Sequence, residues 1–209
     1  MPKKLYPLSP GSSSSVELEW RGMWKDFTVR VDGQELGQMN GQKELTQGGS
    51  WTLADGSTLQ VKLGKSLLGA QLEATRDGVP LPGSGSDPQA QVNGAAGVAF
   101  FIAGLNVLLG VVAIVTEAEL LARLGIGWGS LVFGVIFLGL GFAIRKGSPA
   151  AVIAAVALFA LDGMIGLVSS IEAGLRPGVG GIVFRVFLIV AMAKGIGAAR
   201  QLKAAKKAA

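Results

Sequence analysis

Four long apolar stretches in the second half of the chain limit its fold more than any other feature. They cover about residues 96–116, 127–144, 150–171 and 179–199. At a rise of about 1.5 Å per residue, an apolar helix of this length crosses the hydrocarbon core of a bilayer, which is about 30 Å thick. The sequence therefore predicts a four-helix transmembrane domain over residues 96–199, in which the second helix is the shortest.

These stretches contain two tandem copies of one helical hairpin, at residues 101–146 and 157–197. Each copy has a polar residue four positions before a glycine, followed by a glycine-rich helix start and a Val-Phe pair. In this alignment Asn106 corresponds to Asp162, and Gly134 corresponds to Arg185. The strongly polar departures from the repeat therefore fall inside the predicted membrane region, where polar groups are costly and usually have a role.

Asp162 and Arg185 lie on consecutive predicted helices, about 9–15 Å below the outer surface at 1.5 Å per residue. Either charge alone would cost about 3 kcal/mol in the bilayer, so we expect the Arg185 guanidinium to donate to Asp162. Asn106 is expected as a further hydrogen-bond partner, and Gly134 is expected to leave room for the arginine. This intramembrane polar site either locks the helices together, serves an anion or proton, or pairs with another subunit.

Basic residues beside the apolar stretches predict the orientation of the helices. Only Arg123 and Arg176 lie on one side. The seven on the other side are Arg145, Lys146, Lys194, Arg200, Lys203, Lys206 and Lys207. By the positive-inside rule, both termini are expected on the cytoplasmic side of a bacterial inner membrane, with a basic tail over residues 200–209.

Three Asp-Gly pairs divide the first half of the chain into short strands of alternating polarity. Asp-Gly tolerates positive φ at both central turn positions and is therefore a strong β-hairpin signal. Seven strands are predicted near residues 16–20, 27–31, 35–38, 51–54, 58–63, 70–75 and 79–81. They would form an antiparallel β-sandwich or partly closed barrel over residues 16–83, with Trp20, Phe27 and Trp51 as core anchors.

The segments beside this β domain have a different composition. Residues 1–15 contain three prolines and a run of four serines, so we expect a flexible N-terminal arm. Residues 84–95 combine Gly, Ser and Pro and are expected to form a flexible linker. Residues 41–49 are expected as a polar loop that lacks the ending of a phosphate-binding loop. Residues 117–124 form an amphipathic stretch expected at the outer membrane interface.

The segments VDGQELG, LADGSTLQVKL and TRDGVPLPG carry a resemblance to a known family. Through them, residues 16–83 resemble the β-sandwich of the Fas-apoptosis-inhibitory-molecule family, whose strands are also joined by Asp-Gly turns. This resemblance implies a binding module rather than a catalyst. The complete chain, a β domain followed by four spans, is similar to uncharacterised bacterial four-span membrane proteins, and that similarity implies no function.

The absence of cysteine and histidine from the sequence excludes several kinds of chemistry. Disulfides, thiolate nucleophiles, Ser-His relays and most zinc or haem sites are ruled out. No catalytic, metal or cofactor site is predicted, since no two carboxylates of the β domain have a spacing that suggests acid and base. Residues 1–94 have nine basic and ten acidic groups, whereas the remainder has ten basic and four acidic groups. A lipid surface explains this excess better than a nucleic acid does.

Two classes of function fit these observations. The first is a non-catalytic membrane anchor, scaffold or accessory subunit whose cytoplasmic β domain binds a protein partner. The second is a small transporter or channel with a polar site at Asp162, Arg185 and Asn106, built on parallel repeats. A membrane enzyme acting through Asp162 is disfavoured because a second acid or base is lacking. Small residues at four-residue spacing would also permit a homo-oligomer.

Overall fold

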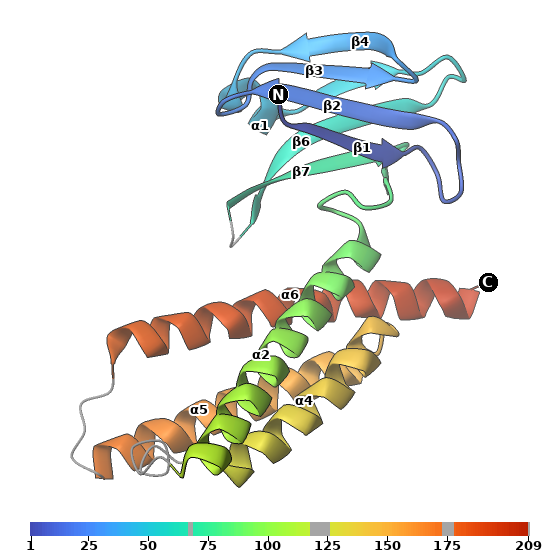
Figure 1. Ribbon diagram of the computed structural model, residues 1–209. Coiled ribbons are helices and arrows are strands. Elements are labelled where there is room, and N and C mark those ends of the chain that lie inside the picture. The colour runs from blue at the N-terminus through green and yellow to red at the C-terminus, as the bar shows by residue number, and fades with distance from the viewer. Residues whose placement is uncertain (67–68, 118–125, 173–177, 209) are drawn as a thin grey trace. The chain divides into compact units, whose positions relative to one another are not determined.

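The structure is a computed structural model that describes residues 1–66, 69–117, 126–172 and 178–208. Two compact units, Met1–Ala90 and Gln91–Ala209, divide the chain. Within the described residues, the first unit contains eight strands and one short helix, and the second contains four long helices (Figure 1). Apart from Glu117, the amphipathic stretch predicted over residues 117–124 lies outside the described residues.

The strands of the first unit form two four-stranded antiparallel sheets, in the orders β1-β2-β3-β4 and β5-β6-β7-β8. Their bounds are β1 (Lys3–Pro7), β2 (Ser15–Arg21), β3 (Lys25–Val31), β4 (Gln34–Met39), β5 (Gly49–Thr52), β6 (Thr58–Ser66), β7 (Gly69–Arg76) and β8 (Val79–Pro80). The seven predicted strands are confirmed, with ends shifted by three residues or fewer. The chain is thus an α+β protein in which two antiparallel sheets precede a helical bundle.

The expected flexible arm over residues 1–15 is wrong, because β1 is an ordered edge strand. It pairs antiparallel with β2 along its whole length. Its Tyr6 side chain is buried in the core of the unit. Pro2 precedes the strand, Pro7 is its last residue, and two lysines lie on it. Proline and lysine are common on edge strands, where they discourage pairing with another chain, so the residues that suggested disorder mark an edge.

Buried side chains from both sheets form one apolar cluster. Its inward-facing members alternate with polar residues along each strand, as the pleat of a strand requires. The most deeply buried large members are Val16, Leu18, Phe27, Val29, Leu45, Leu59, Val61, Leu72 and Leu81. Of the predicted anchors, Phe27 is fully buried and Trp20 is 9% exposed, so both are confirmed as core residues.

Trp51 differs from this prediction because it is only partly buried at the margin of the cluster. A Cβ on Gly37 of β4 or on Gly49 of β5 would collide with its indole ring. The indole therefore occupies space that two glycines leave open. The indole of Trp51, on β5, therefore packs against β4 of the other sheet and does not fill the centre of the core.

Residues 41–49 contain a short helix where a polar loop was expected. This helix, α1 (Gln42–Gln47), buries Leu45 completely in the shared cluster. The Glu44 carboxylate accepts a hydrogen bond from the Asn40 N–H at 2.6 Å, next to the start of the helix. A single leucine between polar residues is thus the side chain through which this helix packs into the core.

The expected flexible linker over residues 84–95 is also wrong. Ser84 is fully buried, and the Gly85 N–H donates to the Leu72 carbonyl of β7 at 2.8 Å. Helix α2 (Pro88–Thr116) begins inside the predicted linker. The Asp87 carboxylate accepts from the Gln89 N–H at 2.9 Å, so Asp87 caps the helix and proline takes its first position. An aspartate cap followed by proline is a strong start signal for a helix.

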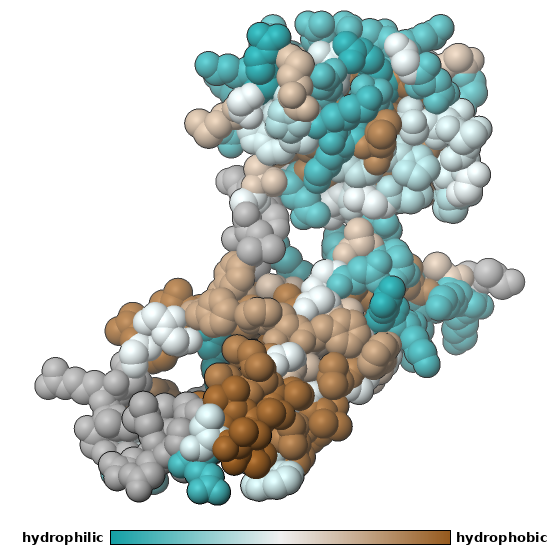
Figure 2. Space-filling view, in the orientation of Figure 1, coloured by the Kyte–Doolittle hydropathy of each residue, from teal (hydrophilic) through white to brown (hydrophobic). Residues whose placement is uncertain are grey.

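The four helices of the second unit are long and apolar enough to cross a membrane. They are α2 (Pro88–Thr116), α4 (Trp128–Arg145), α5 (Pro149–Glu172) and α6 (Val179–Ala208). Their outward side chains form a mainly hydrophobic surface (Figure 2), which includes Leu108, Val135, Met164 and Val183, each more than half exposed. Such a surface is typical of helices solvated by lipid. The predicted four spans are therefore confirmed as helices, and α6 continues through most of the basic tail.

Candidate functional site

An arginine–carboxylate pair joins α5 and α6 inside the helical unit. Arg185 Nη1 donates to Asp162 Oδ2 at 2.9 Å and to the Phe159 carbonyl oxygen at 3.2 Å. The guanidinium carbon also lies 4.7 Å from the centroid of the Phe159 ring, which adds a cation–π contact. The predicted pair between Asp162 and Arg185 is therefore confirmed.

The space for the Arg185 side chain comes from Gly163 and not from Gly134. A Cβ on Gly163 would lie 2.5 Å from both Cδ and Nη1 of Arg185. Gly134 lies against α2 instead, where a Cβ would be 2.6 Å from Val107 Cγ2 and 3.0 Å from the Ala103 carbonyl oxygen. The role expected for Gly134 is therefore wrong. The available signal for Gly163 was its position directly after Asp162.

Asn106 does not join this pair through a hydrogen bond to any described residue. Its side-chain amide donates to the Ile102 carbonyl of the same helix at 2.9 Å. A carbonyl one turn earlier in a helix lies within reach of such a side chain, so this N–H of the amide is bonded without a partner on another helix. The structure therefore links two of the three predicted site residues and leaves the third bonded within α2.

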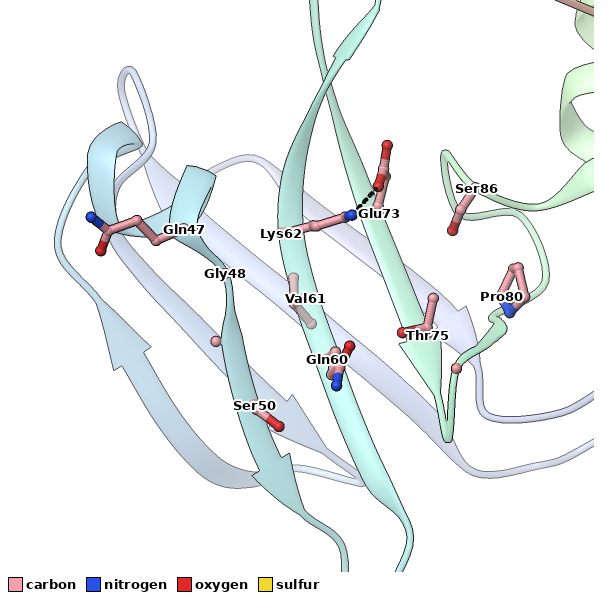
Figure 3. A pocket seen from close by; sticks show the side chains of 12 residues that line it. Gln47, Gly48, Ser50, Gln60, Val61, Lys62, Glu73, Thr75, Pro80 and Ser86 are labelled. Atoms are coloured by element: carbon pink, nitrogen blue, oxygen red, sulfur yellow. Dashed lines mark ion pairs between the residues drawn. The ribbon is translucent and has the colours of Figure 1, made fainter.

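A second candidate site is a groove of about 570 Å³ on the outer face of the β5–β8 sheet (Figure 3). Outward side chains of three neighbouring strands form its floor. Strand pairing places Ser50, Gln60 and Thr75 opposite one another in one row. Lys62 and Glu73 are opposite one another in a second row. The alternation that buries one face of these strands thus lines up polar side chains on the other face.

The two rows of this groove differ in charge and in hydrogen bonding. Lys62 Nζ lies 3.3 Å from Glu73 Oε2, so that row is a neutral ion pair. The side chains of Ser50, Gln60 and Thr75 form no hydrogen bond to any residue that the structure describes. Their hydroxyl and carboxamide groups are free to donate to and accept from a neutral polar ligand.

The outer face of the β1–β4 sheet has a different character. Arg30 lies in its middle, with Nη1 at 2.8 Å from Glu19 and Nη2 at 3.8 Å from Glu35. Lys3 Nζ lies 2.6 Å from Glu17 on the neighbouring strand. These ion pairs are formed within the sheet, so the charged side chains on this face already have partners there.

Neither site has the composition of a metal centre. No group of three or more metal-ligating side chains occurs among the residues that the structure describes. Comparison of the chain with protein-family models, curated proteins and solved structures found no match. The polar pair and the groove are therefore the features from which a function can be inferred.

Proposed function

We propose that the protein is a non-catalytic integral membrane anchor whose β unit binds an extended segment of a partner protein. The observation that carries the proposal is the state of Arg185, whose charge is balanced by Asp162 and whose Nη1 also donates to the Phe159 carbonyl. A charge satisfied in this way stabilises the contact between two helices and needs no transported ligand. In this proposal the pair fixes α5 against α6.

The groove on the outer face of the β5–β8 sheet is the proposed binding surface for the partner. An extended polypeptide presents alternating N–H and C=O groups. The side chains of Ser50, Gln60 and Thr75 can accept hydrogen bonds from these N–H groups and donate hydrogen bonds to these C=O groups. In the same proposal the two sheets form a β-sandwich around their shared cluster. Both termini lie on the cytoplasmic side of a bacterial inner membrane in this proposal, in accordance with the positive-inside rule.

Tandem hairpin repeats are proposed for the helical unit, and the helix ends support them. The alignment that matches Asn106 with Asp162 places Thr116, the last residue of α2, at Glu172, the last residue of α5 that the structure describes. The alignment of the second helices places Trp128, the first residue of α4, at Val179, the first residue of α6. The second helices of the two hairpins therefore begin at corresponding residues.

Site-specific photo-crosslinking tests the proposed binding surface in cells that express the full chain. A photoreactive residue in place of Gln60 is expected to give one discrete protein adduct. The matched control replaces Gln38, an exposed glutamine that pairs with Thr28 on the other sheet, and should give none. Thr75→Arg, which fills the groove, should abolish the Gln60 adduct. Equal adducts at Gln60 and Gln38, or no adduct at Gln60, would contradict the proposal.

A small transporter or channel is the second candidate function, and one observation favours it. Asp162 Oδ1 accepts no hydrogen bond from any described residue, and the Asp162 side chain is 45% exposed in the helical unit. Such an oxygen could receive a proton. Proteoliposomes loaded with a pH-sensitive dye separate the two functions. A proton flux that is lost in Asp162→Asn would support transport, and the absence of flux supports the anchor.

A further inference from the structure

Exposed cations are concentrated in the last turn of α4, the turn that follows it and the C-terminal half of α6. All seven are exposed, and they are Arg145, Lys146, Lys194, Arg200, Lys203, Lys206 and Lys207. No aspartate or glutamate occurs between Glu119 and Asp162 or after Glu172 in the sequence. Within the helical unit, these segments therefore carry positive charge without neighbouring acidic residues in the sequence.

A rigid turn between α4 and α5 holds the first two of these cations. Gly147 has a φ of 82°, and its N–H donates to the Ile144 carbonyl at 2.7 Å. The Ser148 N–H donates to the Ala143 carbonyl at 3.2 Å, which completes a Schellman motif. Ser148 Oγ then accepts from the Ala151 N–H at 3.3 Å and caps α5. Arg145 and Lys146 therefore lie next to a turn that hydrogen bonds fix both at the end of α4 and at the start of α5.

The C-terminal half of α6 packs beside this turn. Ala198 and Ala199 are buried, and Leu202 packs against the same apolar cluster. A Cβ on Gly147 would lie 3.9 Å from a methyl carbon of Leu202, so the turn and the helix are neighbours. Other members of this cluster from the same region are Val92 of α2, Ile144 of α4 and Val152 of α5. Cations from α4, from the turn and from α6 thus share one end of the helical unit.

Three of the cations on α6 lie on one side of the helix. Arg200, Lys203 and Lys207 follow one another at spacings of three and four residues, which places them on one side of a helix. Apolar lipid-facing surface begins close by, because Phe142 is 59% exposed one turn before Arg145. Figure 2 shows hydrophilic residues at the C-terminal end of α6, adjoining the hydrophobic surface of the helices.

We propose that this basic end, defined by the seven cations above, binds the headgroups of anionic phospholipids at the membrane surface. The proposal rests on the proposed membrane insertion. With the apolar surface in hydrocarbon, cations only one turn away reach the level of the headgroups. Each basic residue near an anionic surface strengthens binding by about fivefold at physiological ionic strength, and the effect weakens as salt screens the charges.

Lipid titration of the full chain in a neutral detergent tests this proposal. Detergent-soluble phosphatidylglycerol is expected to raise the thermal unfolding temperature of the helices, followed by circular dichroism, whereas phosphatidylcholine of the same chain length is not. The variant R200Q/K203Q/K207Q should bind phosphatidylglycerol on the order of 100-fold more weakly. The control variant K4Q/K25Q/K43Q removes the same charge from exposed positions of the β unit and should bind as the parent does.

Three outcomes would overturn the inference. They are equal stabilisation by the two lipids, an equal loss of binding in the control variant, or the same stabilisation by inorganic phosphate at the same concentration. Flotation with phosphatidylcholine vesicles and with phosphatidylglycerol vesicles checks membrane insertion independently. A chain that fails to float with vesicles of either lipid contradicts the proposed membrane anchor. A chain that floats equally with both and shows no preference for phosphatidylglycerol contradicts only the lipid-headgroup site.

Discussion

Arg185 lies directly over Gly163, so closely that a Cβ on the glycine would be 2.5 Å from the arginine side chain. This close approach lets Arg185 Nη1 reach both Asp162 and the Phe159 carbonyl. The glycine therefore contributes to the ion pair without touching the carboxylate. A larger residue at this position would move the guanidinium away from its two acceptors.

The first hairpin contains the same contact with the two residue sizes exchanged. Gly134 on α4 faces Val107 and the Ala103 carbonyl on α2. In the alignment of the two hairpins, Gly134 corresponds to Arg185, and Val107 corresponds to Gly163. The glycine is on the second helix in one hairpin and on the first helix in the other. This complementary exchange at corresponding positions supports the proposed repeat.

The glycine contact predicts opposite effects for two similar substitutions on α5. Gly163→Ala should lower the free energy of unfolding by about 1–3 kcal/mol, because the new methyl group displaces Arg185. Gly166→Ala is the matched control, since a Cβ there meets no atom within 4 Å. It should leave the stability unchanged or raise it by up to about 1 kcal/mol through helix propensity. Thermal unfolding in detergent measures both, and equal effects would show that Gly163 has no special role.

The ion pair predicts a non-additive double-mutant cycle. Asp162→Ala and Arg185→Ala each leave an unpaired charge, which costs about 3 kcal/mol in a bilayer and less where water reaches the side chain. The double variant should recover about 1–3 kcal/mol of the summed loss. Unfolding of the four proteins in detergent gives this coupling energy. Additive losses would mean that the bond between Arg185 and Asp162 contributes no stability.

The position of Trp51 predicts a graded cost within the β unit. Phe27→Ala should destabilise the unit by about 3–5 kcal/mol, because the ring is fully buried. Trp51→Ala should cost less, about 2 kcal/mol, since the indole is only partly buried at the margin of the core. Chemical unfolding of the two variants, followed by the circular dichroism of the sheets, compares these costs. A larger cost for Trp51→Ala would place its indole at the centre of the core.

The sequence was sufficient to predict the strands because burial of one face leaves a period of two residues, as in β2 and β3. The sequence was also sufficient to predict the four spans, because helices in contact with lipid require long runs of apolar residues. β1 was missed because Pro2 and Pro7 suggest disorder until the neighbouring strand is known. The start of α2 was missed for a different reason. Asp87 and Pro88 form a helix-start signal, but the surrounding Gly and Ser residues have the composition of a linker.

The candidate site was only partly predictable for a similar physical reason. Opposite charges on consecutive helices have few partners in a membrane, so the pair of Asp162 and Arg185 could be inferred from cost alone. The glycine that makes room for Arg185 depends on the angle and the position at which α5 and α6 cross. Residue spacing in the sequence does not determine that crossing. Asn106 was misassigned because an amide has a local acceptor in every helix. The groove was missed because it depends on the register between three strands.

Burial of the Tyr6 hydroxyl predicts a loss of stability at alkaline pH. Tyr6 is 5% exposed, and this burial raises the pKa of its hydroxyl above the ordinary value of 10.0. The folded state therefore holds the proton more tightly than the unfolded state. The resulting stabilisation is complete below pH 10.0 and is lost as the pH rises through the raised pKa. Tyr6 is the one tyrosine in the sequence, so absorbance of tyrosinate reports its ionisation directly. The control, Tyr6→Phe, should remove this part of the pH dependence. Tyrosinate formation near pH 10 without unfolding would contradict the burial of Tyr6.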